Sequence, residues 1–214
     1  MSLFRLDASI RSEGSVSRAI ADIAEESWRQ GNPDAEVTRR SVGIDPIPST
    51  SWALSVFANR ADFASLSTEQ KAAVDLAATL TDELFAADAL LFAVPLYNFG
   101  VSEHFKTWVD MVISDPRTLN DRPLKDRPAV LVVVRGGAYG AGTPREGWDH
   151  ASGWARRILE DVWGLDLRVV ETELTLAGVN PALDEFKDLA AEMRKESERL
   201  AAEHGRHLTK ALTH

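Results

Sequence analysis

Two uninterrupted apolar runs constrain the fold of this chain more than any other feature. Residues 89–94 read ALLFAV and residues 129–134 read AVLVVV. Runs of this length without a breaker are typical of strands that are buried on both faces, in the middle of a parallel sheet. Pro95 follows the first run, and we expect it to end that strand because proline cannot donate to a ladder.

Segments with helical periodicity alternate with strand segments along the rest of the chain. We expect further strands at residues 3–8, 36–42 and 165–172. Helices are expected at residues 15–30, 52–63, 67 to beyond 84, 102–113, 150–163 and 181 to about 211. Strand and helix thus alternate five times, which predicts a doubly wound parallel sheet with helices on both faces. We expect residues 1–214 to form one domain.

Composition and charge exclude several functional classes. The net charge is −9 and no Lys/Arg block occurs, so nucleic-acid binding is not expected. Cysteine is absent, and the five histidines show no spacing typical of metal ligands, so we expect no metal. No apolar run approaches the roughly 18 residues of a membrane helix. Charged residues near the N-terminus argue against a signal peptide, so we expect a cytoplasmic protein without a membrane partner.

Chemistry-bearing residues follow the expected strands at their carboxyl ends. Tyr97, Asn98 and Phe99 come directly after the run at 89–94. In open α/β sheets this edge binds ligands, and two rings with exposed backbone amides suit a flat ligand with polar edges. Arg135 follows the run at 129–134 and is succeeded by two glycines, which also form tight turns without any ligand.

The loop between the first strand and the first helix is rich in hydroxyl groups. Ser9, Ser15 and Ser17 lie in it, and its end opens a helix, where free N–H groups and the macrodipole attract phosphate. Plain helix capping explains Ser15 and Ser17 equally well. Arg11 either pairs with that phosphate or is a solvated surface residue, and the second interpretation is slightly favoured.

The same loop distinguishes the two common doubly wound folds. Residues 8–17 contain a single glycine, whereas the six-stranded dinucleotide fold requires G-x-G-x-x-G at this place. We therefore expect the flavodoxin-like fold, with five parallel strands in the order 2-1-3-4-5.

Taken together, these three segments resemble the FMN-dependent NADH-azoreductase family, a branch of the NAD(P)H–quinone oxidoreductases with the flavodoxin-like fold. The segments occur in the family's order, and the similarity spans nearly the whole chain. The resemblance implies an FMN site and assigns no catalytic side chain, since the flavin carries the chemistry. The implied FMN-binding residues are Ser9, Ser15, Val16, Ser17, Pro95, Leu96, Tyr97, Asn98, Phe99, Val134, Arg135, Gly136 and Gly137.

The chain also departs from the family's pattern. Leu96 stands where members usually have methionine, and Val134 where many have a hydroxyl residue. Members commonly carry a longer excursion after the helix at 102–113, with a phenylalanine that lies over the flavin. Here residues 114–119 lead through a short polar loop instead, so we expect the cover over the flavin to be reduced or rebuilt.

Three further aromatic residues are candidates for the substrate pocket. Trp52 and Phe57 lie in the irregular region after the second strand, which in the resembling family borders the active site of the neighbouring subunit of a homodimer. Tyr139 follows the two glycines and is the third candidate. Simple packing is an equally good explanation for each ring.

The resemblance implies an enzyme that passes two electrons from NADH or NADPH through FMN to a small aromatic acceptor, in a ping-pong pattern. Quinones, azo compounds and nitroaromatics are the acceptor classes. The alternative is a flavodoxin-type electron carrier or a non-enzymatic FMN-binding protein. Flavodoxins typically have a Thr/Ser-x-Thr-Gly-x-Thr phosphate loop, which this chain lacks.

Overall fold

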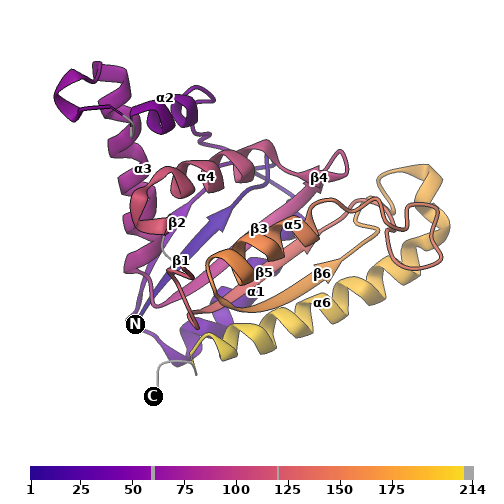
Figure 1. The fold of residues 1–214 in the computed structure, drawn as a ribbon. Helices are drawn as coiled ribbons and strands as arrows, with labels where there is room; N and C mark the ends of the chain where they lie inside the picture. The colour runs from indigo at the N-terminus through magenta and orange to yellow at the C-terminus, as the bar shows by residue number, and fades with distance from the viewer. Residues whose placement is uncertain (59–60, 120, 210–214) are drawn as a thin grey trace.

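A five-stranded parallel sheet forms the centre of the computed structural model, which describes residues 1–58, 61–119 and 121–209 (Figure 1). The order is β2-β1-β3-β5-β6, and a short sixth strand, β4, pairs antiparallel with β3. The predicted order is confirmed, since β4 is only a hairpin extension outside the parallel series. The strands are β1 Ser2–Asp7, β2 Glu36–Arg40, β3 Ala89–Tyr97, β4 Gly100–Val101, β5 Pro128–Val134 and β6 Asp166–Thr172.

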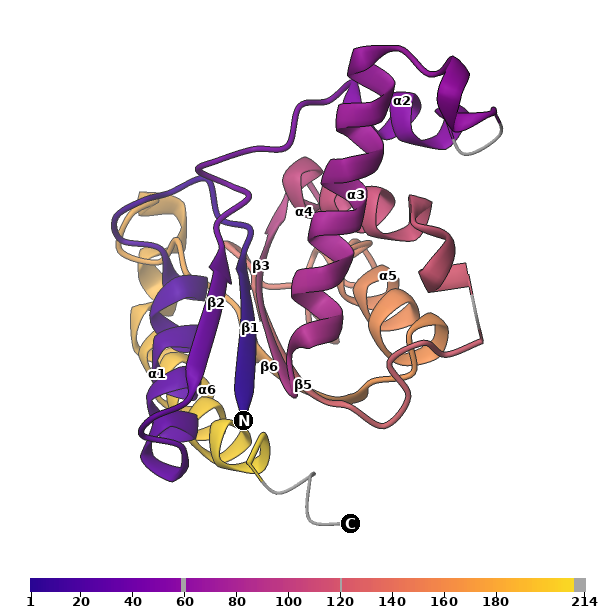
Figure 2. The ribbon, with the colours of Figure 1, turned by 90° about the vertical axis from the view of Figure 1, so that its left-hand side faces the viewer.

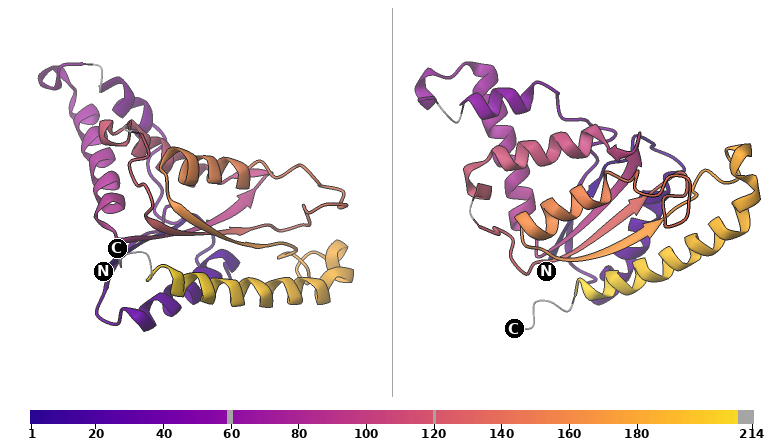
Figure 3. Two further views of the ribbon diagram at one scale, coloured as in Figure 1. Left: turned by 60° about the horizontal axis from the view of Figure 1, so that its bottom comes forward. Right: turned by 45° about the vertical axis from the view of Figure 1, so that its right-hand side comes forward.

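Helices cover both faces of this sheet (Figures 2 and 3). On one face lie α1 (Val16–Gly31) and α6 (Lys187–His207), which pack against each other. On the other face lie α3 (Thr68–Ala86), α4 (Glu103–Ser114) and α5 (Ser152–Arg156). This arrangement is the predicted doubly wound architecture.

Two hydrophobic cores result, one on each face of the sheet. The alternation along β3 shows how one strand serves both, because successive side chains point to opposite faces. Leu90, Phe92 and Val94 belong to the core under α3 and α4, whose centre is the buried Trp108. The alternate residues of β3 belong to the core under α1 and α6. Burial on both faces explains why β3 and β5 are continuous apolar runs.

Serine side chains determine where three of the helices begin. Ser15 accepts a hydrogen bond from the backbone N–H of Arg18 at the start of α1. Ser67 and Gln70 form a capping box at the start of α3. Ser102 caps α4 in the same way. Each cap provides an acceptor for a backbone donor that the helix itself leaves free.

The expectation that Pro95 ends the third strand is wrong, because β3 continues to Tyr97 and Pro95 pairs with Val134. The Ala93 carbonyl accepts from the N–H of Ala8, so the polar groups of Ala93 face β1. The backbone polar groups of Pro95, two residues further along β3, face the same side of the strand. At that point β1 has already ended at Asp7, so no partner strand is present there in the described chain. The missing donor of Pro95 therefore costs no ladder bond.

A two-residue turn joins β3 to β4. Asn98 and Phe99 connect Tyr97 to Gly100, and both have positive φ, 47° and 70°. Positive φ at both central residues is the mark of a type I′ hairpin, whose twist matches that of the strands. The segment at 97–100 is thus the tip of a β-hairpin.

The helix expected at 150–163 contains a change of helical period. After α5, residues Arg157–Val162 form a π-helical turn, and the Trp163 N–H donates to the Ile158 carbonyl. The wider turn shifts the register of the helix, and at its end Trp163 is buried whereas the apolar Val162 is exposed. Periodicity with a fixed 3.6-residue repeat misses such a shift.

Two other helices differ in extent from their predictions. The helix expected at 52–63 is α2 (Ser51–Ala58), with a short 3-10 turn at Phe63–Ser65, and residues 59–60 lie outside the described chain. The C-terminal helix starts as a 3-10 turn, Pro181–Phe186, before α6 begins. Residues 210 and 211 of that expected helix also lie outside the description. In Figures 1 and 2, α2 projects from the body of the sheet.

Candidate functional site

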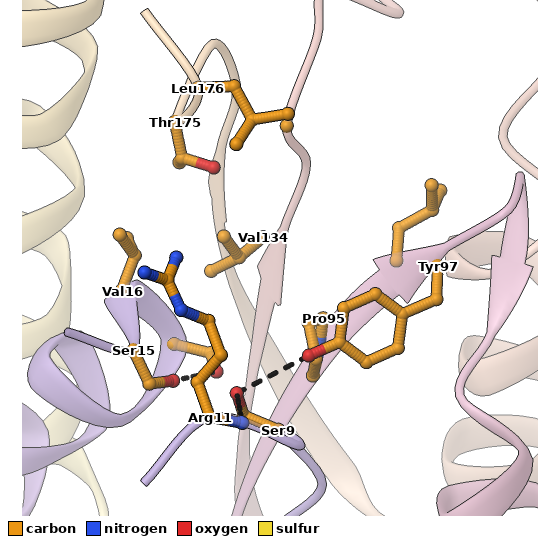
Figure 4. Close-up of a pocket in the computed structure, with 12 residues that line it drawn as sticks. Ser9, Arg11, Ser15, Val16, Pro95, Tyr97, Val134, Thr175 and Leu176 are labelled. Carbon is orange, nitrogen blue, oxygen red and sulfur yellow. Dashed lines mark hydrogen bonds between the residues drawn. The ribbon is translucent and has the colours of Figure 1, made fainter. Parts of the chain in front are cut away.

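A pocket of about 160 Å³ lies at the carboxyl ends of the parallel strands (Figure 4). It opens between β1 and β3, where the strand order reverses direction and doubly wound sheets bind their ligands. Nine of its twelve lining residues are ones that we assigned to the flavin from the sequence. These are Ser9, Ser15, Val16, Ser17, Pro95, Leu96, Tyr97, Val134 and Gly136.

The start of α1 forms one end of the pocket. Ser15 and Ser17 are buried, and their hydroxyl oxygens lie 3.3 Å apart. Ser15 also caps the helix, so capping and pocket lining are compatible roles for one side chain. The first N–H groups of α1 have no acceptor within the helix, and the macrodipole is positive here. Buried hydroxyls beside free N–H groups favour a phosphate.

Arg11 supplies a positive charge to this end of the pocket while staying exposed to solvent, so both interpretations of this residue remain open. Its side chain lines the pocket, and Figure 4 shows the guanidinium extending toward the middle of the cavity. None of the twelve lining residues is a carboxylate. Arg18 is different, because it pairs with Asp7 at 3.1 Å and donates to the Ser9 carbonyl. Arg18 thereby fixes the loop that carries Arg11.

Apolar side chains and a tyrosine line the other end. Pro95 and Leu96 come from β3, and Val134 comes from the end of β5. The Tyr97 hydroxyl accepts from the Ile10 N–H at 3.3 Å and lies 3.4 Å from the Ser9 hydroxyl. Tyr97 therefore bridges β3 to the loop after β1, and Figure 4 shows this contact.

The pocket fits the chemistry of FMN, but its present volume does not hold the whole molecule. Ligand pockets typically enclose about 300 Å³ or more. The cavity of about 160 Å³ is narrower, with the Tyr97 and Arg11 side chains projecting into it. The Tyr97 side chain is half-buried and that of Arg11 is exposed. The donors suit the phosphate, and the apolar strip suits one face of a flat ring.

Sequence reasoning missed two lining residues, Thr175 and Leu176. They follow β6 and run beside the loop after β5. The Leu176 N–H donates to the Gly136 carbonyl at 3.1 Å, and Thr175 donates to the Arg135 carbonyl. The same rule that identified the other loops points to them, since they too follow a parallel strand at its carboxyl end.

The Arg135 side chain is held away from the pocket, although we expected it at the flavin. It is 6% exposed and makes ion pairs with three carboxylates, those of Asp149, Glu171 and Glu173, at 2.6 to 3.2 Å. Burial alone would lower the pKa of Arg135, but Glu171 and Asp149 outweigh it and raise that pKa. Arg135 thus anchors the loop after β5 to β6, and it leaves only its backbone near the pocket.

Asp149 is the acidic partner that closes this loop. Burial raises its pKa, but hydrogen bonds from Ser152 and Ala151 and the charge of Arg135 outweigh that effect and lower the pKa below its usual value. The Ser152 hydroxyl donates to Asp149 at 2.6 Å, and the backbone N–H groups of Ala151 and Ser152 donate at 2.8 and 2.9 Å. One carboxylate therefore caps α5 and pairs with Arg135.

Six other predicted site residues lie outside this pocket. Asn98 and Phe99 form the hairpin turn, and Gly137 lines a neighbouring cavity. Trp52 and Phe57 are on the projecting α2, with 46% and 63% of their surfaces exposed. Tyr139 packs with its ring edge-on to Phe99, at 6.4 Å between centroids. Leu96 and Val134, the two departures from the family pattern, both line the pocket.

The described ranges contain neither a cluster of metal ligands nor a membrane-spanning helix. Within residues 1–58, 61–119 and 121–209, no group of three or more His, Cys, Asp or Glu side chains is placed to hold a metal ion. Over the same ranges, no helix is long and apolar enough to cross a membrane.

Comparisons with known proteins agree with this geometry. A profile of the flavodoxin-like fold family matches residues 1–199. An FMN-dependent NADH:quinone oxidoreductase of Frankia casuarinae is 40% identical over 199 residues, covering 91% of this chain and 94% of that protein. One from Streptomyces coelicolor is 33% identical over 216 residues, covering 99% and 96%.

Solved structures show the same fold. An azoreductase of Bacillus anthracis superposes with a TM-score of 0.79 at 20% identity, covering 97% of this chain and 99% of that one. An FMN-dependent NADH-azoreductase of the same species, solved in complex with FMN, gives a TM-score of 0.74 at 15% identity, covering 94% and 98%. Together with the sequence matches, they show that the chain belongs to the flavodoxin-like fold family, in the branch of the FMN-dependent NADH:quinone oxidoreductases.

Proposed function

We propose that this chain is an FMN-dependent oxidoreductase that passes two electrons from NADH or NADPH to a quinone, azo or nitroaromatic acceptor. The observation that carries the proposal is the pocket at the strand ends, which joins a helix N-terminus and an arginine to an apolar strip and contains no carboxylate. Relatives at 33% to 40% identity that align along most of the chain are named FMN-dependent NADH:quinone oxidoreductases.

Each end of the pocket has a separate task in this proposal. Ser15, Ser17 and the free N–H groups of α1 bind the phosphate, and Arg11 neutralises its charge. Pro95, Leu96 and Val134 would lie along the flavin ring and exclude water there. When bound, the flavin supplies the redox chemistry, accepting a hydride from the nicotinamide and giving two electrons to the acceptor.

The lining residues offer no carboxylate or imidazole that would act as a general acid or base. We therefore assign no catalytic side chain. The hairpin tip at Asn98 and Phe99 follows Tyr97, and Gly137 follows Gly136; Tyr97 and Gly136 line the pocket. We assign the backbone amides of these two segments to the polar edge of the flavin, as the sequence indicated.

We also propose a homodimer, with Trp52 and Phe57 at or near the neighbouring subunit's site. Both rings are exposed on α2, and Phe63 in the next turn is 57% exposed. Large exposed rings that gather on one projecting element are typical of protein interfaces. Light scattering should give twice the mass of one chain, and the double variant W52S/F57S should have a lower mass. A monomeric wild type would contradict the proposal.

The cytoplasmic location remains a prediction that fractionation of the native cells tests.

The activity is tested with purified protein and added FMN. Initial rates at several NADH and quinone concentrations should give the parallel reciprocal plots of a ping-pong reaction, because the donor would leave the site before the acceptor binds. Protein that binds FMN but never oxidises NADH or NADPH with any acceptor class would instead support the electron-carrier alternative. If the protein binds no FMN, both the oxidoreductase and the electron carrier are excluded.

A further inference from the structure

An exposed aromatic cluster with one arginine lies beyond the flavin pocket. Phe99 packs edge-on against Trp148 at 5.5 Å and against Tyr139 at 6.4 Å between ring centroids. The Arg145 guanidinium lies 5.9 Å from the Phe99 ring centre and 5.7 Å from that of Tyr139. Phe99 and Trp148 are 38% and 51% exposed, so the cluster faces solvent.

Hydrogen bonds hold this cluster between the β3–β4 hairpin and the segments that follow β5 and β6. The His150 N–H donates to the Phe99 carbonyl at 2.9 Å, which ties the loop after β5 to the β3–β4 hairpin. The Tyr139 N–H donates to Glu173 at 2.9 Å. Phe99 and Tyr139 follow Tyr97 and Gly136 closely in sequence, and because the latter two line the pocket, the cluster adjoins the end where the flavin ring is proposed.

Arg145, like Arg11, has no acidic partner within the described chain, and in this it differs from Arg135 and Arg18. Among the residues that the structure describes, Arg135 pairs with three carboxylates and Arg18 with Asp7, whereas no ion pair involves Arg145. The nearby carboxylates already have donors, since Glu146 accepts from the Gly142 N–H and Glu173 accepts from Arg135. Cation–π contacts position Arg145 without using its N–H donors.

Arg145 also lines a second cavity, separate from the flavin pocket. It measures about 490 Å³ and is lined mostly by apolar residues, with Arg145 as its charged member and no carboxylate. Gly136 and Thr175 line the flavin pocket, whereas their chain neighbours Gly137 and Leu174 line this cavity. Two short chain segments thus separate the cavities. Its apolar wall consists of Leu174, Leu183, Phe186 and Leu189.

The geometry points to a subsite for a flat apolar group that carries an anion, with Arg145 as its specificity-determining residue. This inference rests on the proposed function, because the subsite adjoins the proposed flavin ring. Leu183 and Phe186 would contact the ring system, and the free guanidinium would bind a sulfonate, carboxylate or phosphate. The anion has two sources, an acidic aromatic acceptor or the phosphate of the nicotinamide dinucleotide.

Direct binding tests the subsite without any reaction. Equilibrium dialysis compares naphthalene-2-sulfonate with the uncharged naphthalene-2-sulfonamide on the FMN-loaded protein. R145M keeps an apolar chain against the two rings and removes the charge, so the sulfonate should bind about five-fold to ten-fold more weakly while the sulfonamide is unaffected. R145K should keep most of the preference for the sulfonate over the sulfonamide, because lysine keeps the positive charge. R157M is the matched control, because Arg157 is an exposed arginine paired with Asp161 on the helix surface.

Kinetics then identify the source of the anion. In a ping-pong reaction, the kcat/KM values of donor and acceptor are measured separately. If R145M lowers kcat/KM for 1,4-naphthoquinone-2-sulfonate but not for 1,4-naphthoquinone, the subsite binds the acceptor. If R145M lowers kcat/KM only for NADH or NADPH, the subsite binds the dinucleotide. Unchanged sulfonate binding together with unchanged kcat/KM for all of these substrates overturns the inference. A wild type that turns over no acceptor refutes the proposed function instead, and the dialysis result still decides the subsite.

Discussion

Arg11 and Arg135 both follow parallel strands, yet their surroundings give them opposite roles. Arg135 is buried among three carboxylates, so its charge is used within the protein. Arg11 is exposed and lines a pocket without a carboxylate, so its charge remains available to a ligand. Sequence position alone does not distinguish them, because the acidic partners of Arg135 are up to 38 residues away.

Removing the charge of Arg11 should weaken the binding of FMN. We expect R11M to raise the Kd about three-fold to ten-fold, since an exposed ion pair contributes modestly. The loss should shrink at high salt because exposed charges are screened. Quenching of flavin fluorescence measures the Kd. R156M is the control, since Arg156 is exposed and pairs with Glu160 on α5. Equal Kd values for R11M and wild type would remove Arg11 from the phosphate site.

Ser15 and Ser67 allow capping to be separated from phosphate binding. Each caps a helix, α1 or α3, so S15A and S67A should both lower the free energy of unfolding by about 1 kcal/mol. Only Ser15 lines the pocket, so only S15A should also raise the Kd for FMN, by about five-fold or more. Urea denaturation and flavin titration measure the two effects. Identical FMN affinity in both variants would leave Ser15 with capping alone.

Asp149 should contribute to acid stability. Its pKa is lowered in the folded chain, so it stabilises the fold above the unfolded pKa near 3.8, and that contribution is lost as pH falls through the folded pKa. D149N should therefore be less stable than wild type at pH 6, and the difference should shrink below about pH 3.8. Urea denaturation at several pH values measures it. A difference that is constant with pH would mean that the carboxylate charge does not matter.

Among the structural elements, the β3–β4 hairpin depends most on backbone conformation. Asn98 has φ of 47°, a region that glycine and asparagine tolerate and β-branched residues do not. N98V should destabilise the protein by about 1–2 kcal/mol, whereas N98G should stay within about 0.5 kcal/mol of wild type. Urea denaturation compares the two. Equal stability of N98V and wild type would contradict the type I′ turn.

The starts of helices are easier to predict from the sequence than features that depend on neighbouring elements. The starts of the helices at Ser67 and Ser102 are predicted from local residues, and in the structure each of the two serines caps the helix that follows it. The continuation of β3 through Pro95 depends on where β1 ends, and the π-helical turn before Trp163 depends on packing against the sheet. Neither fact lies within the local sequence window, so periodicity and breaker rules fail at both places.

At the level of the whole molecule, the strand order brings most of the predicted site together. The residues that line the pocket come from the ends of neighbouring strands, and topology alone makes them adjacent. The predictions that placed Arg135 and Phe99 at the pocket relied on the resemblance for side-chain direction. Those directions are set by ion pairs and ring contacts between distant segments, which no single sequence reveals.

The central claim is that one pocket binds a flavin through its phosphate. Isothermal titration calorimetry of the protein with FMN and with riboflavin tests this most directly, because the two ligands differ only in that group. The account predicts that FMN binds at least about 100-fold more tightly, since the phosphate would gain several charge-assisted hydrogen bonds at α1. Equal affinities for the two flavins, or no heat of binding with either, would contradict it.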